Sequence, residues 1–409
     1  MSRAYAPVPT ASSLSSGLIG LLALLTAVAP LATDMYLPAF PAMAADLQTA
    51  ASTVQLTLTT FLLGLALGQL VIGPLSDQWG RRGLLIAGTA LCAVAGVACA
   101  LTPSAEFLIV ARFLQGFGGA AGVVLSRAVL TDRSSGPATA KLFSLLMLIG
   151  GVAPVIAPLL GGVVITGLGW RGVFWVLSAL SALMLLGILS AVPETLPAAR
   201  RRSGGLRTLA SDTRAVLGNR TYLGYTLSFG FSMAAMFAYI SASPFVLQNM
   251  LGLSELAYSA AFAFNALGLM LVSGLNAALV TRYGAPRLLA LGVKLLLAVA
   301  ALLLVDITAL HLPLWPTLLL LFGLVSSLGL IFGNAAGLAT SEVRQTAGTG
   351  SALLGALQFS LAAVVSPLVG LAGEHSALPM GLMILAAALL AVLFHTTLLR
   401  PRPVAAADV

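Results

Sequence analysis

The sequence predicts an all-α membrane protein of twelve transmembrane helices in two bundles of six. Of its 409 residues, 59% are hydrophobic and only 8% are charged, and the mean hydropathy is +1.05. A soluble domain carries about a quarter of its residues charged, so most of this surface must face lipid. Uncharged apolar stretches of about 20 residues recur along the chain, and each can cross a hydrocarbon core of roughly 30 Å.

Twelve such stretches can be separated, and helices are the element that fits them. The stretches are about twice as long as a barrel strand, and they lack the alternation of inward and outward residues that a barrel needs. The first is expected to remain in the protein, because its apolar run is long and no small-residue cleavage pattern precedes the next helix. The predicted spans are 15–37, 52–74, 83–102, 107–128, 139–165, 170–192, 220–243, 255–279, 287–307, 314–338, 348–371 and 378–399.

Basic residues predict the orientation, because lysine and arginine are retained in cytoplasmic loops. Of the 20 basic residues, only Arg171 falls at an outer helix end, Arg112 and Lys294 lie deeper within predicted spans, and the other 17 fall on the cytoplasmic side. Both termini are therefore expected in the cytoplasm, and the net charge of +8 is explained by membrane topology rather than by nucleic-acid binding. The cytoplasmic set is Arg3, Arg81, Arg82, Arg127, Arg133, Lys141, Arg200, Arg201, Arg202, Arg207, Arg214, Arg220, Arg282, Arg287, Arg344, Arg400 and Arg402.

Residues 193–219 contain two prolines, a Gly-Gly pair and five arginines, and this stretch marks the boundary between the halves. The predicted organisation is a six-helix bundle over 1–192, a cytoplasmic linker over 193–219, and a second six-helix bundle over 220–409. Two bundles of this kind can rock about a central site. Within the linker, 206–217 could form a short interfacial helix or part of a solvated tether.

The sequence lacks the groups that other classes of membrane protein need. Cys92 and Cys99 would lie roughly 10 Å apart on one helix, too far for a disulfide. The three histidines are scattered near helix ends, and neither a nucleotide-binding loop nor a filter-like loop is present. We therefore expect no cofactor or metal, and a carrier rather than a multi-pass enzyme or a channel.

Several stretches together resemble the major facilitator superfamily, specifically its Bcr/CflA type of drug:proton antiporter. In the first half they are LATDMYLPAFPAMAADL at 31–47, GPLSDQWGRRG at 73–83, RFLQG at 112–116 and GGVAPVIAPLLGG at 150–162. In the second half they are YISASPFVLQ at 239–248 and FAFNALGL at 262–269. The loop motif at 73–83 alone would specify only the superfamily, and its combination with the other stretches is more specific.

The resemblance implies a proton-coupled exporter of antibiotics and other small amphipathic or neutral compounds, working by alternating access in the cell membrane. Members of the family export bicyclomycin, phenicols and sulfonamides. We expect a monomer in the bilayer whose partners are its small-molecule substrate and protons. A proton-coupled exporter of a metabolite, such as an amino acid derivative or a purine, is the alternative within transporters.

Asp34 and Arg112 are the predicted proton-coupling residues. Asp34 falls within the first predicted span, where a carboxylate costs roughly 2.5–3.5 kcal/mol unless it faces a cavity, finds a partner or carries a proton. Arg112 follows the outer end of the fourth span by about 9 Å of helix, so its depth should match that of Asp34 and make it the counter-charge. The alternatives are an interfacial, hydrated acid for Asp34 and a purely structural ion pair for Arg112.

Four residues are predicted to contact substrate. Gln115 lies one helical turn after Arg112 and could bond either the substrate or a neighbouring helix. Tyr36 stands in the DMYLP stretch, and Tyr239 is the cavity candidate among the many aromatic residues of the seventh helix. Asn265 supplies an uncharged hydrogen-bonding group in the eighth helix, where the alternative is a contact between helices.

Two further motifs are predicted to control conformational change. In the loop at 73–83, the glycines permit a tight reversal, and by resemblance Asp77 would pair with a helix N-terminus of the opposite half and with a basic residue, for which Arg127 is suitably placed. A topological anchor is the alternative. The stretch 150–162 resembles the antiporter motif, although Ala157 stands where the family has glycine before Pro158. The gating set is Gly73, Asp77, Gly80, Arg81, Arg82 and Arg127, and the antiporter set is Gly151, Pro154, Pro158 and Gly162.

Overall fold

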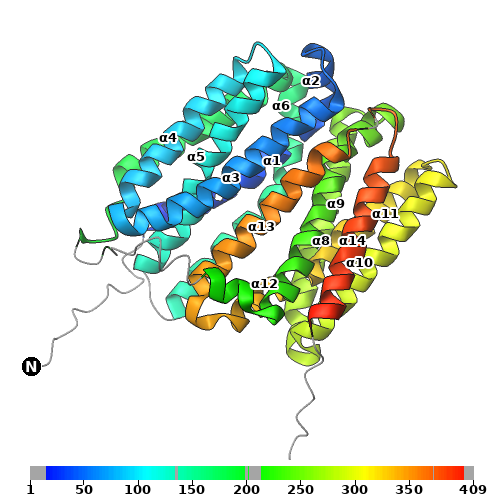
Figure 1. The fold of residues 1–409 in the computed structure, drawn as a ribbon. Helices are drawn as coiled ribbons and strands as arrows, with labels where there is room; N and C mark the ends of the chain where they lie inside the picture. Colours follow the sequence, from blue (N-terminus) through cyan, green and yellow to red (C-terminus); the bar gives the residue numbers. More distant parts are fainter. Residues whose placement is uncertain (1–14, 134–136, 199–200, 202–212, 372, 400–409) are drawn as a thin grey trace, which may run out of the picture.

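The computed structural model describes residues 15–133, 137–198, 201, 213–371 and 373–399. Within these ranges the chain forms helices joined by short turns and contains no strand, which confirms the predicted all-α membrane fold. The helices before the linker and those after it form two bundles that lie side by side (Figure 1).

The first bundle contains six crossings. Its elements are α1 (Ser16–Asp34), η2 (Leu37–Ala39), α2 (Phe40–Asp46), α3 (Ala51–Trp79), α4 (Arg81–Ala100), α5 (Ala105–Arg133) and α6 (Pro137–Ala191). The first crossing is interrupted by a short 3₁₀ turn, and the last two crossings are joined to each other within α6.

The second bundle begins at Arg220, and its seventh and tenth crossings change helix type along their length. Its elements are α8 (Arg220–Pro244), the π-helical η4 (Phe245–Met250), α9 (Glu255–Tyr283), α10 (Ala285–Thr308), α11 (Leu314–Ser327), η5 (Leu328–Leu330), α12 (Phe332–Glu342), η6 (Arg344–Thr346), α13 (Ala347–Leu368) and α14 (Leu378–Leu398).

The described helices include 11 segments long and apolar enough to cross a membrane, one fewer than predicted. The difference lies in α6, whose 55 residues contain Gly169 in a non-helical conformation with a φ of 68°. A straight helix of that length would measure about 80 Å, far more than a bilayer, so α6 is two crossings joined at Gly169. The twelve predicted spans are therefore all present, and the join falls between the spans predicted to end at 165 and to begin at 170.

The first crossing is longer than predicted and changes direction within the bilayer. α1 ends at Asp34, and the chain continues through η2 and α2 as far as Asp46 rather than ending near residue 37. Pro38 lacks the N–H group that α1 would need in order to continue, so the chain tightens into a 3₁₀ turn before the helix resumes. This interruption places Asp34 at the end of a helix, deep in the bundle.

Two glycines make the corresponding reversals in the two halves. Gly80 separates α3 from α4 with a φ of 103°, and Gly284 separates α9 from α10 with a φ of 80°. Side chains other than glycine rarely adopt these angles, so a single residue can both end one helix and begin the next. Gly73 was also expected to contribute to the first reversal, but it lies inside α3, which corrects that prediction.

Apolar side chains cover the outside of the bundles, and polar side chains are enclosed. Trp315, Leu371 and Leu168 are 77%, 73% and 70% exposed, as expected of surfaces that contact lipid. The bundles meet where α3 packs against α13 and where α6 packs against α9. In Figure 1, α13 runs along the boundary beside the helices of the first bundle.

Candidate functional site

Asp34 lies where α1 ends and the two bundles meet. Its carboxyl is 5% exposed, and its Oδ1 accepts a hydrogen bond of 2.9 Å from the hydroxyl of Thr33. The carboxyl is also within electrostatic range of two hydroxyls of the second bundle, those of Tyr239 on α8 and Tyr258 on α9. A titratable group at membrane depth thus faces the opposite half of the protein.

Arg112 is completely buried in the first bundle among neutral partners. Its Nη1 donates to Gln115 Oε1 at 2.6 Å, and its Nη2 donates to the carbonyl of Ala32 at 3.0 Å. Ala32 stands in the last turn of α1, where a cation is favourable because the carbonyl dipoles point toward it. The guanidinium carbon lies 4.3 Å from the ring centre of Tyr36 and 4.2 Å from that of Phe61.

The expected ion pair between Asp34 and Arg112 is not formed in this structure. Within the described part of the chain, Arg112 has no carboxylate within salt-bridge distance. The two residues do share the depth that helix geometry predicted, since Arg112 binds the carbonyl two residues before Asp34. Spacing along a helix predicts depth but not the direction of a side chain. Here the carboxyl of Asp34 bonds the hydroxyl of Thr33, and the guanidinium of Arg112 bonds the carbonyl of Ala32.

Two of the four predicted substrate residues turn inward within the first bundle. Gln115 is 1% exposed, and its amide bonds Arg112 while lying close to Gly96 of α4. The hydroxyl of Tyr36 is 3.3 Å from Thr57 Oγ1, and its ring packs on Phe40. Both side chains therefore pack around Arg112 in this state.

The other two predicted substrate residues lie together in the second bundle. Asn265 Nδ2 donates to the hydroxyl of Tyr239 at 2.8 Å, and the ring of Tyr239 stacks on Phe262. One turn away, the hydroxyls of Ser243 and Tyr258 are 3.1 Å apart. This polar group of α8 and α9 lies opposite Asp34 and completes a site shared between the bundles.

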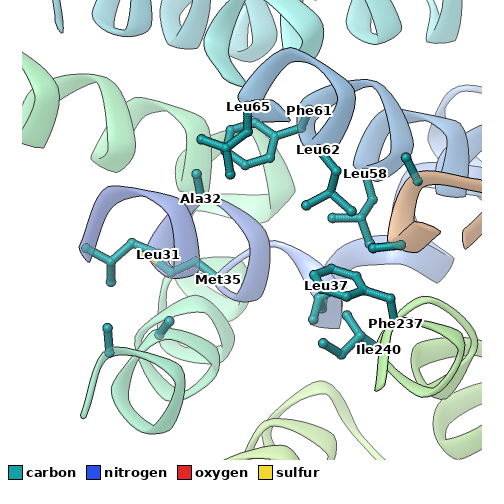
Figure 2. Close-up of a cluster of buried hydrophobic side chains, with 14 of the residues drawn as sticks. Leu31, Ala32, Met35, Leu37, Leu58, Phe61, Leu62, Leu65, Phe237 and Ile240 are labelled. Atoms are coloured by element: carbon teal, nitrogen blue, oxygen red, sulfur yellow. The ribbon is translucent and has the colours of Figure 1, made fainter. Parts of the chain in front are cut away.

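An apolar cluster surrounds the interruption of the first crossing. Figure 2 shows Leu37 of η2 close to Phe237 and Ile240 of α8, while Ala32 of α1 lies toward Phe61 and Leu65 of α3. Outside this cluster, Gln248 Nε2 of η4 donates to the carbonyl of Pro38 at 3.0 Å. The outer ends of the first and seventh crossings are therefore in direct contact.

The antiporter stretch has one end in the interface between bundles and the other outside it. A methyl group placed on Gly162 would lie 2.6 Å from Ser259 Oγ of α9, so the α6 and α9 backbones approach closely there. Gly151, at the inner end, is exposed and has no neighbour that such a methyl would meet. Pro154 and Pro158 lie inside α6 between these two glycines.

The gating loop forms its ion pairs within the first bundle. Arg81 Nη1 lies 2.6 Å from Asp77 Oδ1, and Arg81 Nε lies 3.3 Å from Asp132 Oδ2. Arg127, the expected partner of Asp77, is not within salt-bridge distance of it, so the expected pair is not formed in this structure. The acid that the sequence interpretation missed is Asp132, which also accepts a bond of 2.9 Å from Thr195.

A second missed acid, Glu194, lies three residues after the end of α6 and caps the start of α4. Its oxygens accept the backbone N–H groups of Arg81 at 2.9 Å and Arg82 at 3.2 Å. Partial burial would raise the pKa of Glu194, but these two bonds, a third from Leu196 and the charge of Arg201 hold it below its ordinary value. Arg82 also donates from its side chain to the carbonyl of Leu189, which ties the same turn to the end of α6.

Comparison with known proteins relates this architecture to membrane transporters. A family model described as Major Facilitator Superfamily matches residues 22–367. An uncharacterized MFS-type transporter, YdgK, of Bacillus subtilis (strain 168) is 39% identical over 94% of this chain and 95% of its own. A bicyclomycin resistance protein homolog of Haemophilus influenzae is 30% identical over 88% of this chain and 90% of its own.

Two further likenesses are narrower or concern the fold alone. A chloramphenicol resistance protein of Pseudomonas aeruginosa is 34% identical over 64% of this chain and 62% of its own. The crystal structure of a bacterial homolog to the human lysosomal transporter Spinster, in an inward-facing and unoccupied conformation, aligns with a TM-score of 0.73 at 16% identity. That alignment covers 95% of this chain and 96% of the other.

Proposed function

Because the chain belongs to the major facilitator superfamily, and so is a multi-pass membrane transporter of small molecules, we propose that it exports drug-like compounds in exchange for protons. The observation that carries the proposal is Asp34, a buried carboxyl at the meeting of the two bundles that has no counter-ion among the described residues. The resistance proteins to which the chain is similar support the drug class, since two of them are named for resistance to bicyclomycin and to chloramphenicol.

The proposed cycle uses competition between a proton and a substrate for the surroundings of Asp34. An ionised carboxyl in an apolar enclosure is costly, and either a proton or polar groups of a bound compound can lower that cost. When the site faces the cytoplasm, drug entry displaces the proton. When it faces outward, proton entry displaces the drug. Each ligand therefore weakens the binding of the other, and the coupling is reciprocal.

Arg112 has a supporting role in this proposal. Its charge is permanent, because an arginine side chain keeps its proton in proteins, and its present partners are neutral. A fixed positive charge near the site reduces the free-energy cost of the ionised form of Asp34. The apolar and aromatic walls around it suit amphipathic or neutral compounds better than strongly charged ones.

Replacing Asp34 with Asn tests the coupling directly. The wild-type protein is expected to lose drug affinity as the pH falls, because protonation competes with binding, whereas Asp34→Asn should bind with an affinity independent of pH. Drug binding to the purified protein across a pH series measures this difference. Glu106→Gln, at an exposed acid in the first turn of α5, is the control and should keep the wild-type dependence. A wild-type pH profile in Asp34→Asn would overturn the proposed role.

Transport in sealed vesicles tests substrate class and ion coupling together. A panel of antibiotics and fluorescent compounds should be moved while a pH gradient is present, and this transport should stop when an ionophore collapses the gradient. Transport of purines or amino acid derivatives, with no movement of drugs, would identify a metabolite exporter instead. Gradient-independent flux of any compound would argue against antiport.

We further propose that the protein lies in the cytoplasmic membrane as a monomer, with both termini in the cytoplasm. The distribution of arginines supports this orientation, because the described turns with Arg81, Arg82, Arg282 and Arg287 share one side of the bundles. Labelling of single cysteines by a membrane-impermeant reagent in whole cells tests it. Thr281→Cys, at an exposed position beside the same turn, should be protected, and His375→Cys should react.

A further inference from the structure

The boundary between α3 and α13, called here the α3–α13 seam, carries a glutamine near each of its ends. Gln55 and Gln69 are 14 residues apart on α3, which is close to four turns and about 21 Å, so they lie on the same face. A methyl group on Gly370 would collide with Gln55 Oε1, and one on Gly355 would lie 3.2 Å from Gln69 Oε1. Both side chains therefore contact the opposite bundle.

The outer glutamine is engaged with the second bundle. Gln55 is 1% exposed, and its Nε2 donates to the carbonyl of Ser241 on α8 at 3.0 Å. Ser366 donates to the backbone carbonyl of Gln55 at 3.4 Å, and its hydroxyl lies 2.8 Å from that of Ser241. Gln55 thus joins two helices of the second bundle at the outer end of the seam, α8 through its side chain and α13 through its backbone carbonyl.

The inner glutamine has no such partner. Gln69 Nε2 is enclosed without a hydrogen-bond acceptor, although its Oε1 lies near α13 at Gly355. A buried donor left without an acceptor destabilises the state in which it occurs. The amide therefore favours any arrangement of the bundles that brings an acceptor to it.

The remaining contacts indicate which end of the molecule is closed. In the described residues, the side-chain hydrogen bonds between bundles are those of Gln55, Ser366 and Gln248, and all three belong to the outer half. Asp77, at the inner end, pairs within its own bundle. Between described residues, the polar side-chain contacts that join the two bundles thus lie at the outer end.

We propose that Gln55 and Gln69 are positioning residues of the transport step that hold opposite ends of the seam in alternate states. Gln55 bonds across the outer end when that end is closed, and it is released when the bundles rock. Gln69 bonds across the inner end when that end closes, as the hydroxyl of Ser351, one turn from Gly355, approaches its amide. This inference depends on the bundles rocking, and it is independent of the substrate and of the coupled ion.

The distance between the outer ends of the bundles tests this proposal without a transport assay. Nitroxide labels can be placed at Ala45→Cys and His375→Cys, two exposed positions in outer segments of different bundles, while the native thiols of Cys92 and Cys99 are buried. Pulsed electron spin resonance on the full-length protein in lipid nanodiscs then gives the populations with the outer end closed and open. Methionine replaces each glutamine, because it matches the length of the side chain without its hydrogen bonds.

The two variants should shift the populations in opposite directions. Gln55→Met should raise the ratio of open to closed about fivefold, the factor that one net hydrogen bond supplies, and Gln69→Met should lower it by a similar factor. Gly370→Ala should open the outer end as Gln55→Met does, because the added methyl displaces the same amide. Leu67→Met, at a half-exposed position of α3, is the control and should leave the ratio unchanged. Shifts in the same direction, or no shift in either glutamine variant, would refute the proposal.

Discussion

Thr33 is the hydrogen-bond partner of the Asp34 carboxyl in this structure. Its hydroxyl lies 2.9 Å from Asp34 Oδ1 and also within 3.1 Å of the carbonyls of Ala29 and Pro30. A hydroxyl has one proton and two lone pairs, so it can donate to an ionised carboxyl or accept from a protonated one while donating to a carbonyl. The same side chain can therefore serve Asp34 in both of its protonation states.

Replacing Thr33 with Val should change the pH dependence of drug binding. The bond to an ionised carboxyl is the stronger of the two, so its loss penalises the ionised form more. The pH at which drug affinity is half-lost should move upward by about half a unit, while Thr33→Ser, which keeps the hydroxyl, should retain the wild-type curve. Binding titrations across a pH series measure both. Identical curves for Thr33→Val and the wild type would show that the hydroxyl has no such role.

At the residue scale, the sequence predicted which groups are buried better than it predicted their partners. Asp34, Arg112, Tyr239 and Asn265 are all buried, and Asp34 and Arg112 lie at similar depth because the rise of a helix converts sequence spacing into distance. The hydrogen-bond partners of Arg112 depend on side-chain torsions and on the interruption of the first crossing after Asp34. The spacing of residues along the sequence describes neither of them. Thr33 was missed for the same reason, since a threonine within an apolar helix has no distinctive pattern.

At the scale of single elements, the start of α4 depends on a carboxyl that follows α6. Glu194 accepts two of the first backbone N–H groups of α4, which otherwise have no partner within the helix. A negative charge at a helix N-terminus stabilises it by about 0.3–1 kcal/mol at the surface. The turn between α3 and α4 is therefore fastened to the end of the first bundle.

Replacing Glu194 with Gln should lower thermal stability in a manner that depends on pH. The pKa of Glu194 is depressed in the folded protein, so its contribution is present above the ordinary glutamate value of about 4.5 and is lost as the pH falls through the lower folded value. The unfolding midpoint of Glu194→Gln should thus lie below that of the wild type at pH near 7, and the gap should close in acid. Thermal unfolding in detergent at several pH values measures the gap. A gap that widens on acidification would contradict the assignment.

Helix boundaries were predictable where glycine or polar residues end an apolar run, and not elsewhere. Gly80 and Gly284 lie between predicted spans and do form the reversals. The predicted first span ended nine residues before the crossing does. The helix type changes at η2, but the apolar sequence runs on through α2, so composition did not mark the true end. The π-helical segment after Pro244 was likewise not foreseen, since a π-helix has no apolar period of its own over six residues.

At the scale of the whole molecule, the two bundles meet along two flanks, one where α3 packs on α13 and one where α6 packs on α9. On both flanks the bundles approach closely near the outer end. On one flank, Gln55 of α3 meets Gly370, two residues after the end of α13, and on the other, Gly162 of α6 meets Ser259 of α9. Backbones can approach this closely only where one partner lacks a side chain. A closed outer end therefore requires both glycines, and rocking must separate both flanks together.

Enlarging Gly162 should prevent the closed state on the second flank. Even a methyl group there would lie 2.6 Å from Ser259 Oγ, so the branched side chain of Gly162→Val cannot be accommodated without moving α6 away from α9. We expect the outer end to remain open, with a cysteine at Leu37, buried in this structure, becoming reactive toward impermeant thiol reagents and export falling more than tenfold. Gly167→Val, five residues further along α6 with no neighbour within 4 Å, should behave as the wild type in both measurements. Because the variant and its control add the same side chain to the same helix, protection of Leu37→Cys in Gly162→Val would mean that this flank does not determine closure.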